Sequence, residues 1–160
     1  MNIQLTARFA PRGATPSSPM EQSLHDLLVE CTLTNTGKTT IPFGEWNCSW
    51  DKNWFTTSVK LRLPGINCSM NFVVPHSLKP GESYRKCVPL CLMDKIKPGE
   101  RVEFRMRFVS QGMRDQRVEY FVVESDSLVF VVPNPALQAG VLTVVGAGLF
   151  MGVKQWRSRR

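Results

Sequence analysis

The sequence predicts an all-β fold in which short antiparallel strands form a sandwich, followed by one hydrophobic C-terminal helix. Three observations lead to this prediction. Apolar and polar residues alternate along several short runs, as they do in strands with one buried face. Proline-glycine turns separate these runs. No stretch before residue 136 keeps a helical period of 3.6 residues. A barrel of similar strand number is the structural alternative.

The first strands are expected on either side of a loop. Residues 3–9 form a short apolar run, and residues 11–23 hold prolines, serines and threonines typical of a loop. In residues 27–35, LLVECTLTN, every second residue is apolar, which predicts a half-buried strand with Cys31 on its apolar side. Residues 35–38, Asn-Thr-Gly-Lys, then supply turn chemistry.

The same alternation continues downstream. Residues 59–63 read Val-Lys-Leu-Arg-Leu, and in residues 102–108 the alternation places Phe104 inside and Arg105 outside. Turns are expected at Pro64-Gly65, Pro80-Gly81 and Pro98-Gly99. Two further runs, residues 117–123 and 127–132, complete about seven or eight strands, the number and spacing of an immunoglobulin-like sandwich. We therefore expect one β domain over residues 1–132.

Charge and composition narrow the class of protein. The chain of 160 residues carries a formal charge of +7, but four of its twenty basic residues lie in the last seven positions. Residues 1–153 contain sixteen basic and thirteen acidic side chains, a net charge of only +3. This is an ordinary mixed surface and argues against nucleic acid as a partner. The apolar share of 42% is that of a folded globular chain.

Residues 133–160 differ in kind and predict a membrane anchor with a basic end. Residues 136–153 contain no charge, and as a helix they would extend about 27 Å, enough for a thin bilayer. Cationic residues and a tryptophan follow, as expected at a membrane interface. The alternative is that this segment packs on the domain. The expected anchor residues are Leu142, Gly146, Leu149, Phe150, Lys154, Trp156, Arg157, Arg159 and Arg160.

The side of the membrane on which the domain lies is left open by the sequence. The basic C-terminus favours a cytoplasmic end and hence a domain outside. The first residues, MNIQLTARFAPRG, lack the apolar run of a secretory signal. Tail anchoring from the cytosol is the alternative, and it would require the basic end to cross the membrane.

Part of the chain resembles a group of uncharacterised bacterial β-sandwich domains. The matching features, from Cys31 to Phe108, are Cys48-Ser49-Trp50, Cys68 with an asparagine three positions on, and the run Leu-Lys-Pro-Gly-Glu-Ser at residues 78–83. The resemblance implies the sandwich fold and no particular activity. Residues 132–135, Val-Pro-Asn-Pro, with the apolar segment and the arginine-rich end resemble a PEP-CTERM sorting signal. That resemblance implies delivery to a bacterial surface by an exosortase-type system.

The five cysteines suggest at most a limited disulfide content. A bridge between Cys48 and Cys68 would close a loop of about twenty residues and stabilise by about 3 kcal/mol, in an oxidising compartment. Two thiols in a tryptophan-rich corner are the alternative. Cys87 and Cys91, with His76, invite a zinc interpretation, but a strand would separate the two cysteines by about 13 Å. We therefore expect no metal.

An aromatic cluster offers the one candidate binding surface. Trp46, Trp50 and Trp54 lie close in sequence between two expected strands. If exposed, they would form a platform for a glycan or a protein partner. The interpretation we favour is that they are buried and close one end of the sandwich.

The sequence contains no recognisable catalytic arrangement and no cofactor motif. Only His25 beside Asp26 and His76 beside Ser77 bring a base near another polar group, and sequence neighbours on a strand point to opposite faces. We expect a non-enzymatic, membrane-anchored interaction or structural module whose ligand is unknown. The alternative is a soluble domain that binds a ligand such as a glycan, with the tail packed on the domain.

Overall fold

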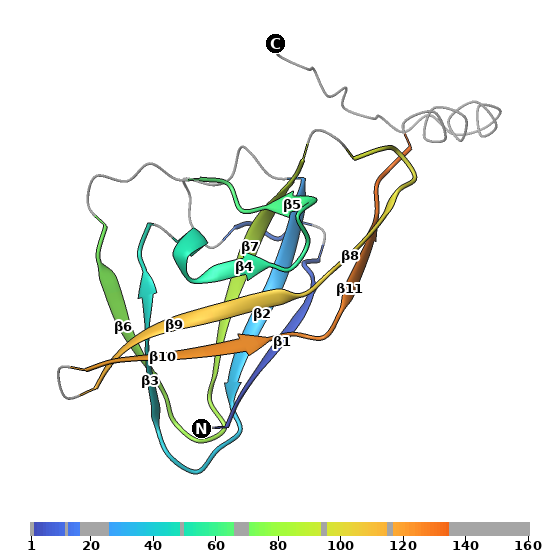
Figure 1. Ribbon diagram of the computed structural model, residues 1–160. Coiled ribbons are helices and arrows are strands. Elements are labelled where there is room, and N and C mark those ends of the chain that lie inside the picture. Colours follow the sequence, from blue (N-terminus) through green and yellow to red (C-terminus); the bar gives the residue numbers. More distant parts are fainter. Residues whose placement is uncertain are drawn as a thin grey trace.

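The computed structural model describes residues 2–11, 13–16, 26–48, 50–65, 71–93, 96–114 and 117–134 (Figure 1). These residues form an all-β structure with antiparallel sheets, as predicted, and they contain no α-helix. A single 3₁₀ turn, η2, covers Trp50–Lys52. The strands are β1 Ile3–Phe9, β2 Leu27–Asn35, β3 Ile41–Trp46, β4 Trp54–Thr56, β5 Leu61–Arg62, β6 Val73–Leu78, β7 Ser83–Leu92, β8 Arg101–Phe104, β9 Met106–Arg114, β10 Arg117–Glu124 and β11 Leu128–Val131.

The largest sheet has the strand order β1-β2-β7-β5. Val29, Cys31 and Leu33 of β2 have no exposed surface, and the residues between them point to the opposite face, so the predicted alternation of β2 is confirmed. In β7 the same alternation directs Tyr84, Lys86, Val88 and Leu90 inward. This sheet therefore presents one face to the core and one to solvent.

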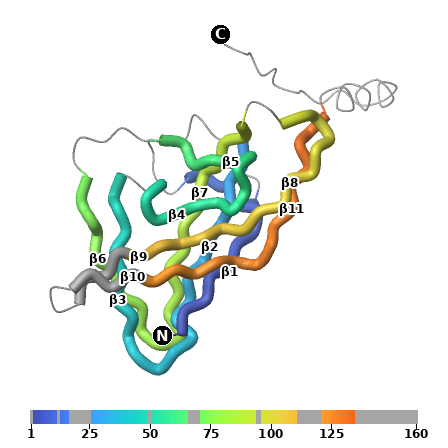
Figure 2. The backbone as a smooth tube through the Cα atoms, in the orientation of Figure 1, coloured from blue at the N-terminus to red at the C-terminus, as the bar shows by residue number. Residues whose placement is uncertain are grey.

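A long hairpin crosses the molecule beside this sheet (Figure 2). β8 and β9 follow one another with a break at Arg105, while β10 and β11 run antiparallel to them. At the break, the Met106 amide donates to Ser125 Oγ (3.0 Å) and the Arg105 amide donates to Thr57 Oγ1 (2.9 Å). Phe104 is 1% exposed and Arg105 is exposed, which confirms the predicted phase of this strand. This break explains part of the difference between the eleven strands found in the described residues and the seven or eight expected.

β3 and β6 form a separate antiparallel ribbon joined to β2 and β7 at a corner. Asn35, fully buried at the end of β2, holds this corner. Its side-chain amide donates to the Thr39 and Leu78 carbonyls, both at 2.8 Å, and its Oδ1 accepts the Gly37 amide at 2.9 Å. The predicted turn at residues 35–38 is therefore present. β3 also lies against β9, where the Gly44 amide donates to Ser110 Oγ.

Two of the three predicted proline-glycine turns adopt the expected conformation. Gly81 and Gly99 have φ near +80°, which glycine accepts without a steric cost. In each turn the glutamate that follows reaches back: Glu82 accepts the Lys79 amide at 2.8 Å and Glu100 accepts the Lys97 amide at 2.9 Å. Gly65 does not have a positive φ, so the conformation predicted for Pro64-Gly65 was wrong at the glycine.

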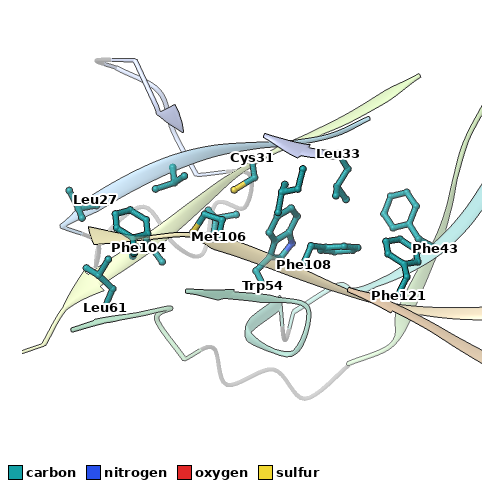
Figure 3. Close-up of a cluster of buried hydrophobic side chains, with 14 of the residues drawn as sticks. Leu27, Cys31, Leu33, Phe43, Trp54, Leu61, Phe104, Met106, Phe108 and Phe121 are labelled. Atoms are coloured by element: carbon teal, nitrogen blue, oxygen red, sulfur yellow. The ribbon is translucent and has the colours of Figure 1, made fainter. Parts of the chain in front are cut away.

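The core lies where these sheets meet (Figure 3). Side chains of β2 point toward those of β8 and β9. Trp54 of β4 and Leu61 of β5 complete the cluster. The side chains with 1% exposure or less include Val29, Cys31, Leu33, Trp54, Val88, Leu90, Val102, Phe104, Met106 and Phe108. After β11, Val132 is buried and exchanges backbone hydrogen bonds with Gly99 and Glu100.

The alternation predicted for residues 59–63 was wrong at its first position. Val59 is 91% exposed and precedes the strand, which covers only Leu61–Arg62. Leu61 is buried as expected. The Leu61 amide donates to the Ser58 carbonyl, so the chain turns at Val59 instead of extending through it.

Candidate functional site

The most unusual chemistry of the described residues is a buried polar cluster around Glu45. This carboxylate on β3 is 4% exposed and accepts three hydrogen bonds from side chains. Trp54 Nε1 donates to Oε1 at 2.5 Å, Lys86 Nζ donates to Oε1 at 2.8 Å, and the Tyr84 hydroxyl donates to Oε2 at 2.7 Å. The cluster thus links β3, β4 and β7 through one acidic group.

Strand phase brings these groups together. Ile41, Phe43 and Glu45 alternate along β3 and are all buried, so Glu45 occupies an inward position that an apolar residue would normally fill. Lys86 occupies an inward position on β7, opposite Cys31 of β2, and is 8% exposed. A buried charge needs a partner because its desolvation costs several kcal/mol. The Glu45 carboxylate and the Lys86 ammonium are each the partner of the other charge.

Two aromatic rings and a histidine border the cluster. The His76 imidazole of β6 stacks on Phe43 with a centroid distance of 4.9 Å, and Tyr84 lies 5.0 Å from the same imidazole. Partial burial lowers the pKa of His76 against an opposing influence of the Glu45 charge. Burial, with the Glu45 carboxylate beside it, raises the pKa of Tyr84 well above its usual range. Both groups are therefore neutral at physiological pH.

A second buried polar residue, Asn53, joins β3 to β9. Its side-chain amide donates to the Gly44 carbonyl (3.2 Å) and the Val109 carbonyl (2.7 Å), and its Oδ1 accepts the Trp46 amide (2.7 Å). Asn53 is fully buried, and both ends of its side-chain amide are hydrogen-bonded to backbone groups of the fold. Asn53 satisfies the backbone groups of β3 and β9 just before β4 begins at Trp54, which is a structural role.

The Glu45 cluster is better suited to specifying the fold than to catalysis. A carboxylate has about four acceptor positions, and three are occupied by fixed donors. The Glu45 side chain is only 5% exposed, so little of the carboxylate is accessible to a substrate. Buried networks whose members satisfy one another favour one arrangement of the strands over its alternatives.

The three predicted tryptophans do not share one surface. Trp54 is fully buried, and its indole nitrogen is used by Glu45, so Trp54 cannot belong to an exposed platform. Trp46 is half-buried with the Lys52 ammonium 4.8 Å from its ring centroid. The side chain of Trp50 lies outside the described residues. Trp54 is buried, as the interpretation favoured from the sequence expects.

The cysteines divide into three environments. Cys48 is disulfide-bonded. Its expected partner, Cys68, lies outside the described residues, so that pairing stays a prediction. Cys31 is a buried thiol whose pKa burial raises well above the usual range, which makes it unreactive. Burial also raises the pKa of the Cys87 and Cys91 thiols. Among the described residues no three His, Cys, Asp or Glu side chains gather as metal ligands.

Of the paired groups considered for catalysis, the structure describes Asp26, His76 and Ser77. His25 is outside the described residues, and Asp26 accepts the Leu92 amide at 2.8 Å, which joins β2 to the end of β7. His76 belongs to the aromatic contacts of the cluster, and Ser77 is exposed at the neighbouring strand position.

The expected anchor lies outside the described residues, which end at Asn134. This applies to every anchor residue named above, from Leu142 to Arg160. Within the part of the chain that the structure describes, no helix has the length and apolar character needed to cross a membrane.

A shallow depression of about 260 Å³ lies on the opposite face of the sheet formed by β1, β2 and β7. It is lined by Thr6, Ala7, Arg8, Glu30, Thr32 and Arg85. Neither this group nor the Glu45 cluster was predicted from the sequence. Strand phase was the available signal: Glu45 follows Ile41 and Phe43 at the inward spacing, while Arg8 and Glu30 sit at outward positions.

No known protein family, curated protein or solved structure matches the chain.

Proposed function

We propose that the protein is a non-enzymatic interaction or structural module held at a membrane by its C-terminal segment. The observation that carries the proposal is the change in composition after Val132. Val132 is still hydrogen-bonded to Gly99 and Glu100 of the β body, whereas residues 136–153 of the sequence are uncharged and are followed by a basic end. A segment of this composition has the length of a short membrane span.

The non-enzymatic part of the proposal rests on where the ionisable side chains lie. The buried carboxylate, ammonium and phenol near β3 are bonded to one another. The cysteine with no exposed surface has a raised pKa, the reverse of an activated nucleophile. These groups stabilise the body, which leaves the outer faces of the sheets for binding.

The disulfide at Cys48 supports a domain outside the cytoplasm. Disulfides persist in oxidising compartments, whereas cytosolic thiols are kept reduced. A domain on the oxidising side and a basic C-terminus on the cytoplasmic side agree with the distribution of positive charge around membrane spans. We infer a single span with this orientation and Cys68 as the partner of Cys48.

The finer fold assignment is part of the same proposal. An immunoglobulin-like sandwich is supported by the four-stranded sheet β1-β2-β7-β5, by the sheet β10-β9-β4, and by the packing of β3 on β9. In that arrangement the core residues of β2 and β9 belong to facing sheets. The C-terminal helix of the proposal covers residues 136–153.

Membrane fractionation tests the anchor. The full chain should sediment with membranes and resist alkaline extraction, whereas a chain ending at Val132 should be released. If both chains stay in the soluble fraction, the alternative of a soluble binding domain with a packed tail replaces the proposal.

Peptide mapping tests the side of the membrane. Cells expressing the full chain are lysed in an alkylating reagent, and the peptides are analysed without reduction. A cross-linked peptide containing Cys48 and Cys68 supports the oxidising side. Alkylated Cys48 in the membrane fraction would show that the domain faces the cytosol.

A further inference from the structure

The polar face of the β1-β2-β7 sheet carries two arginines around one buried carboxylate. Glu30 is 8% exposed, and its Oε1 accepts Arg8 Nε at 2.8 Å and lies 2.6 Å from a terminal nitrogen of the same guanidinium. Arg85 Nε is 3.8 Å from the same oxygen. The side chains of Arg8 and Arg85 remain 68% and 66% exposed. Glu30 therefore positions cations that still face solvent.

Strand pairing sets the spacing of this group. Arg8 lies opposite Glu30, and Thr6 and Arg85 both lie opposite Thr32. The two threonines are short, so a depression of about 260 Å³ opens between the longer arginine side chains. This volume is smaller than the roughly 300–1,000 Å³ of most small-molecule pockets, which fits one chemical group of a larger ligand.

The donors left in the depression suit an oxyanion. Each guanidinium has five N–H donors, and Glu30 occupies only part of them. Two arginines and one glutamate leave a net charge of +1, which matches a monoanionic carboxylate. The hydroxyls of Thr6 and Thr32 can both donate and accept, as the hydroxyl groups of a sugar require. Further along the same face Thr34 and Ser83 add two more hydroxyls, 2.8 Å apart.

We propose that this depression binds the carboxylate of an acidic saccharide, with Arg8 and Arg85 holding the carboxylate and Thr6 and Thr32 contacting adjacent hydroxyls. The inference rests on the proposed function, because it names the ligand class of the interaction module. It does not depend on the anchor, since the depression lies within the described β body.

Titration of the full chain in mild detergent with an oligouronate tests the site. A neutral glucose oligomer of equal length is the control ligand. Arg85→Gln should weaken oligouronate binding about tenfold or more, the loss expected for a hydrogen bond to a charged group. Arg105→Gln, which removes the same charge from a different face, should leave the affinity within about twofold. Thr32→Val should weaken binding while preserving the charge.

Arg85 is the informative variant because its contact with Glu30 is long, so its loss leaves the Arg8–Glu30 pair in place. Equal weakening by Arg85→Gln and Arg105→Gln would overturn the proposal in favour of unspecific charge attraction. Equal binding of the neutral oligomer, or no binding of either ligand, would also overturn it. Binding of poly-glutamate but not the oligouronate would make this an acidic-peptide site. Because the titration needs no membrane, failure of the anchor would be seen separately in fractionation.

Discussion

Removing one charge from the Glu45–Lys86 pair should destabilise the fold far more than removing both. Glu45→Gln keeps an oxygen that can accept a hydrogen bond from Trp54 Nε1. It also places an NH₂ group beside the Tyr84 hydroxyl oxygen, which can accept a hydrogen bond. The substitution removes the negative charge that faces Lys86. Lys86→Met removes the ammonium and leaves the buried carboxylate with two neutral donors.

The expected loss of unfolding free energy follows from the burial of the two charged side chains. The two side chains are 10% and 5% exposed, so each single variant leaves a largely desolvated charge and should lose about 3–5 kcal/mol of unfolding free energy. The double variant holds an amide and a thioether with no buried charge, and should lose about 1–2 kcal/mol. The summed single losses exceed the double-variant loss, so the two substitutions should couple by at least about 4 kcal/mol. A loss of 3–5 kcal/mol is a large part of the stability of a small domain.

Urea unfolding of the full chain in mild detergent, followed by tryptophan fluorescence, measures these differences. Trp54 is a suitable reporter because it is buried against Glu45. Arg107→Gln, which breaks an exposed pair with Glu124, is the control and should shift the midpoint little. Additive effects of Glu45→Gln and Lys86→Met, or single variants no weaker than the control, would refute the assigned role of the cluster.

Three further outcomes are expected from the same unfolding assay. Phe104→Asp should prevent folding while Arg105→Asp is tolerated, because position 104 is buried and 105 is exposed; equal tolerance would show that the strand phase is wrong. Gly81→Ala should cost about 1 kcal/mol because φ is positive there, whereas Gly65→Ala should not, and equal costs would contradict the turn assignment. The lowered pKa of His76 means that the unfolded chain binds its proton more readily, so stability should fall as pH drops below about 6.5. His76→Phe should remove this part of the decline, distinct from the loss below about pH 4.5 expected from the lowered pKa of Glu100 and Glu124; an unchanged profile would exclude His76 as its source.

Local pattern was enough to predict the strands in which alternation is regular. The inward positions from Leu27 to Leu33 in β2 and from Val102 to Phe108 in β8 and β9 are apolar, and both strands were assigned with the correct phase. The two lysine-proline-glycine-glutamate turns were predictable because glycine at that position meets a steric requirement of the backbone. These features depend on residues close in sequence.

The candidate sites depend on contacts between distant residues and were not predicted. β7 lies at the centre of its sheet, yet Lys86 and Pro89 interrupt its apolar pattern. An inward lysine is explained only when the glutamate of β3 is placed opposite it, 41 residues earlier in the chain. Similarly, Arg8, Glu30 and Arg85 meet through the pairing of three strands, which no local pattern encodes.

Moving one charge along the C-terminal segment tests whether that segment anchors the β body in a membrane. Gly146 lies near the middle of the uncharged stretch, where an arginine costs about 2.5–3.5 kcal/mol of insertion free energy. Ser158 lies among the terminal cations, where another positive charge is neutral or favourable at an anionic surface. Flotation of membranes from cells expressing each full chain should therefore recover the wild type and Ser158→Arg but lose Gly146→Arg to the soluble fraction. A soluble wild type, or a Gly146→Arg chain that still floats with membranes, would contradict the anchor.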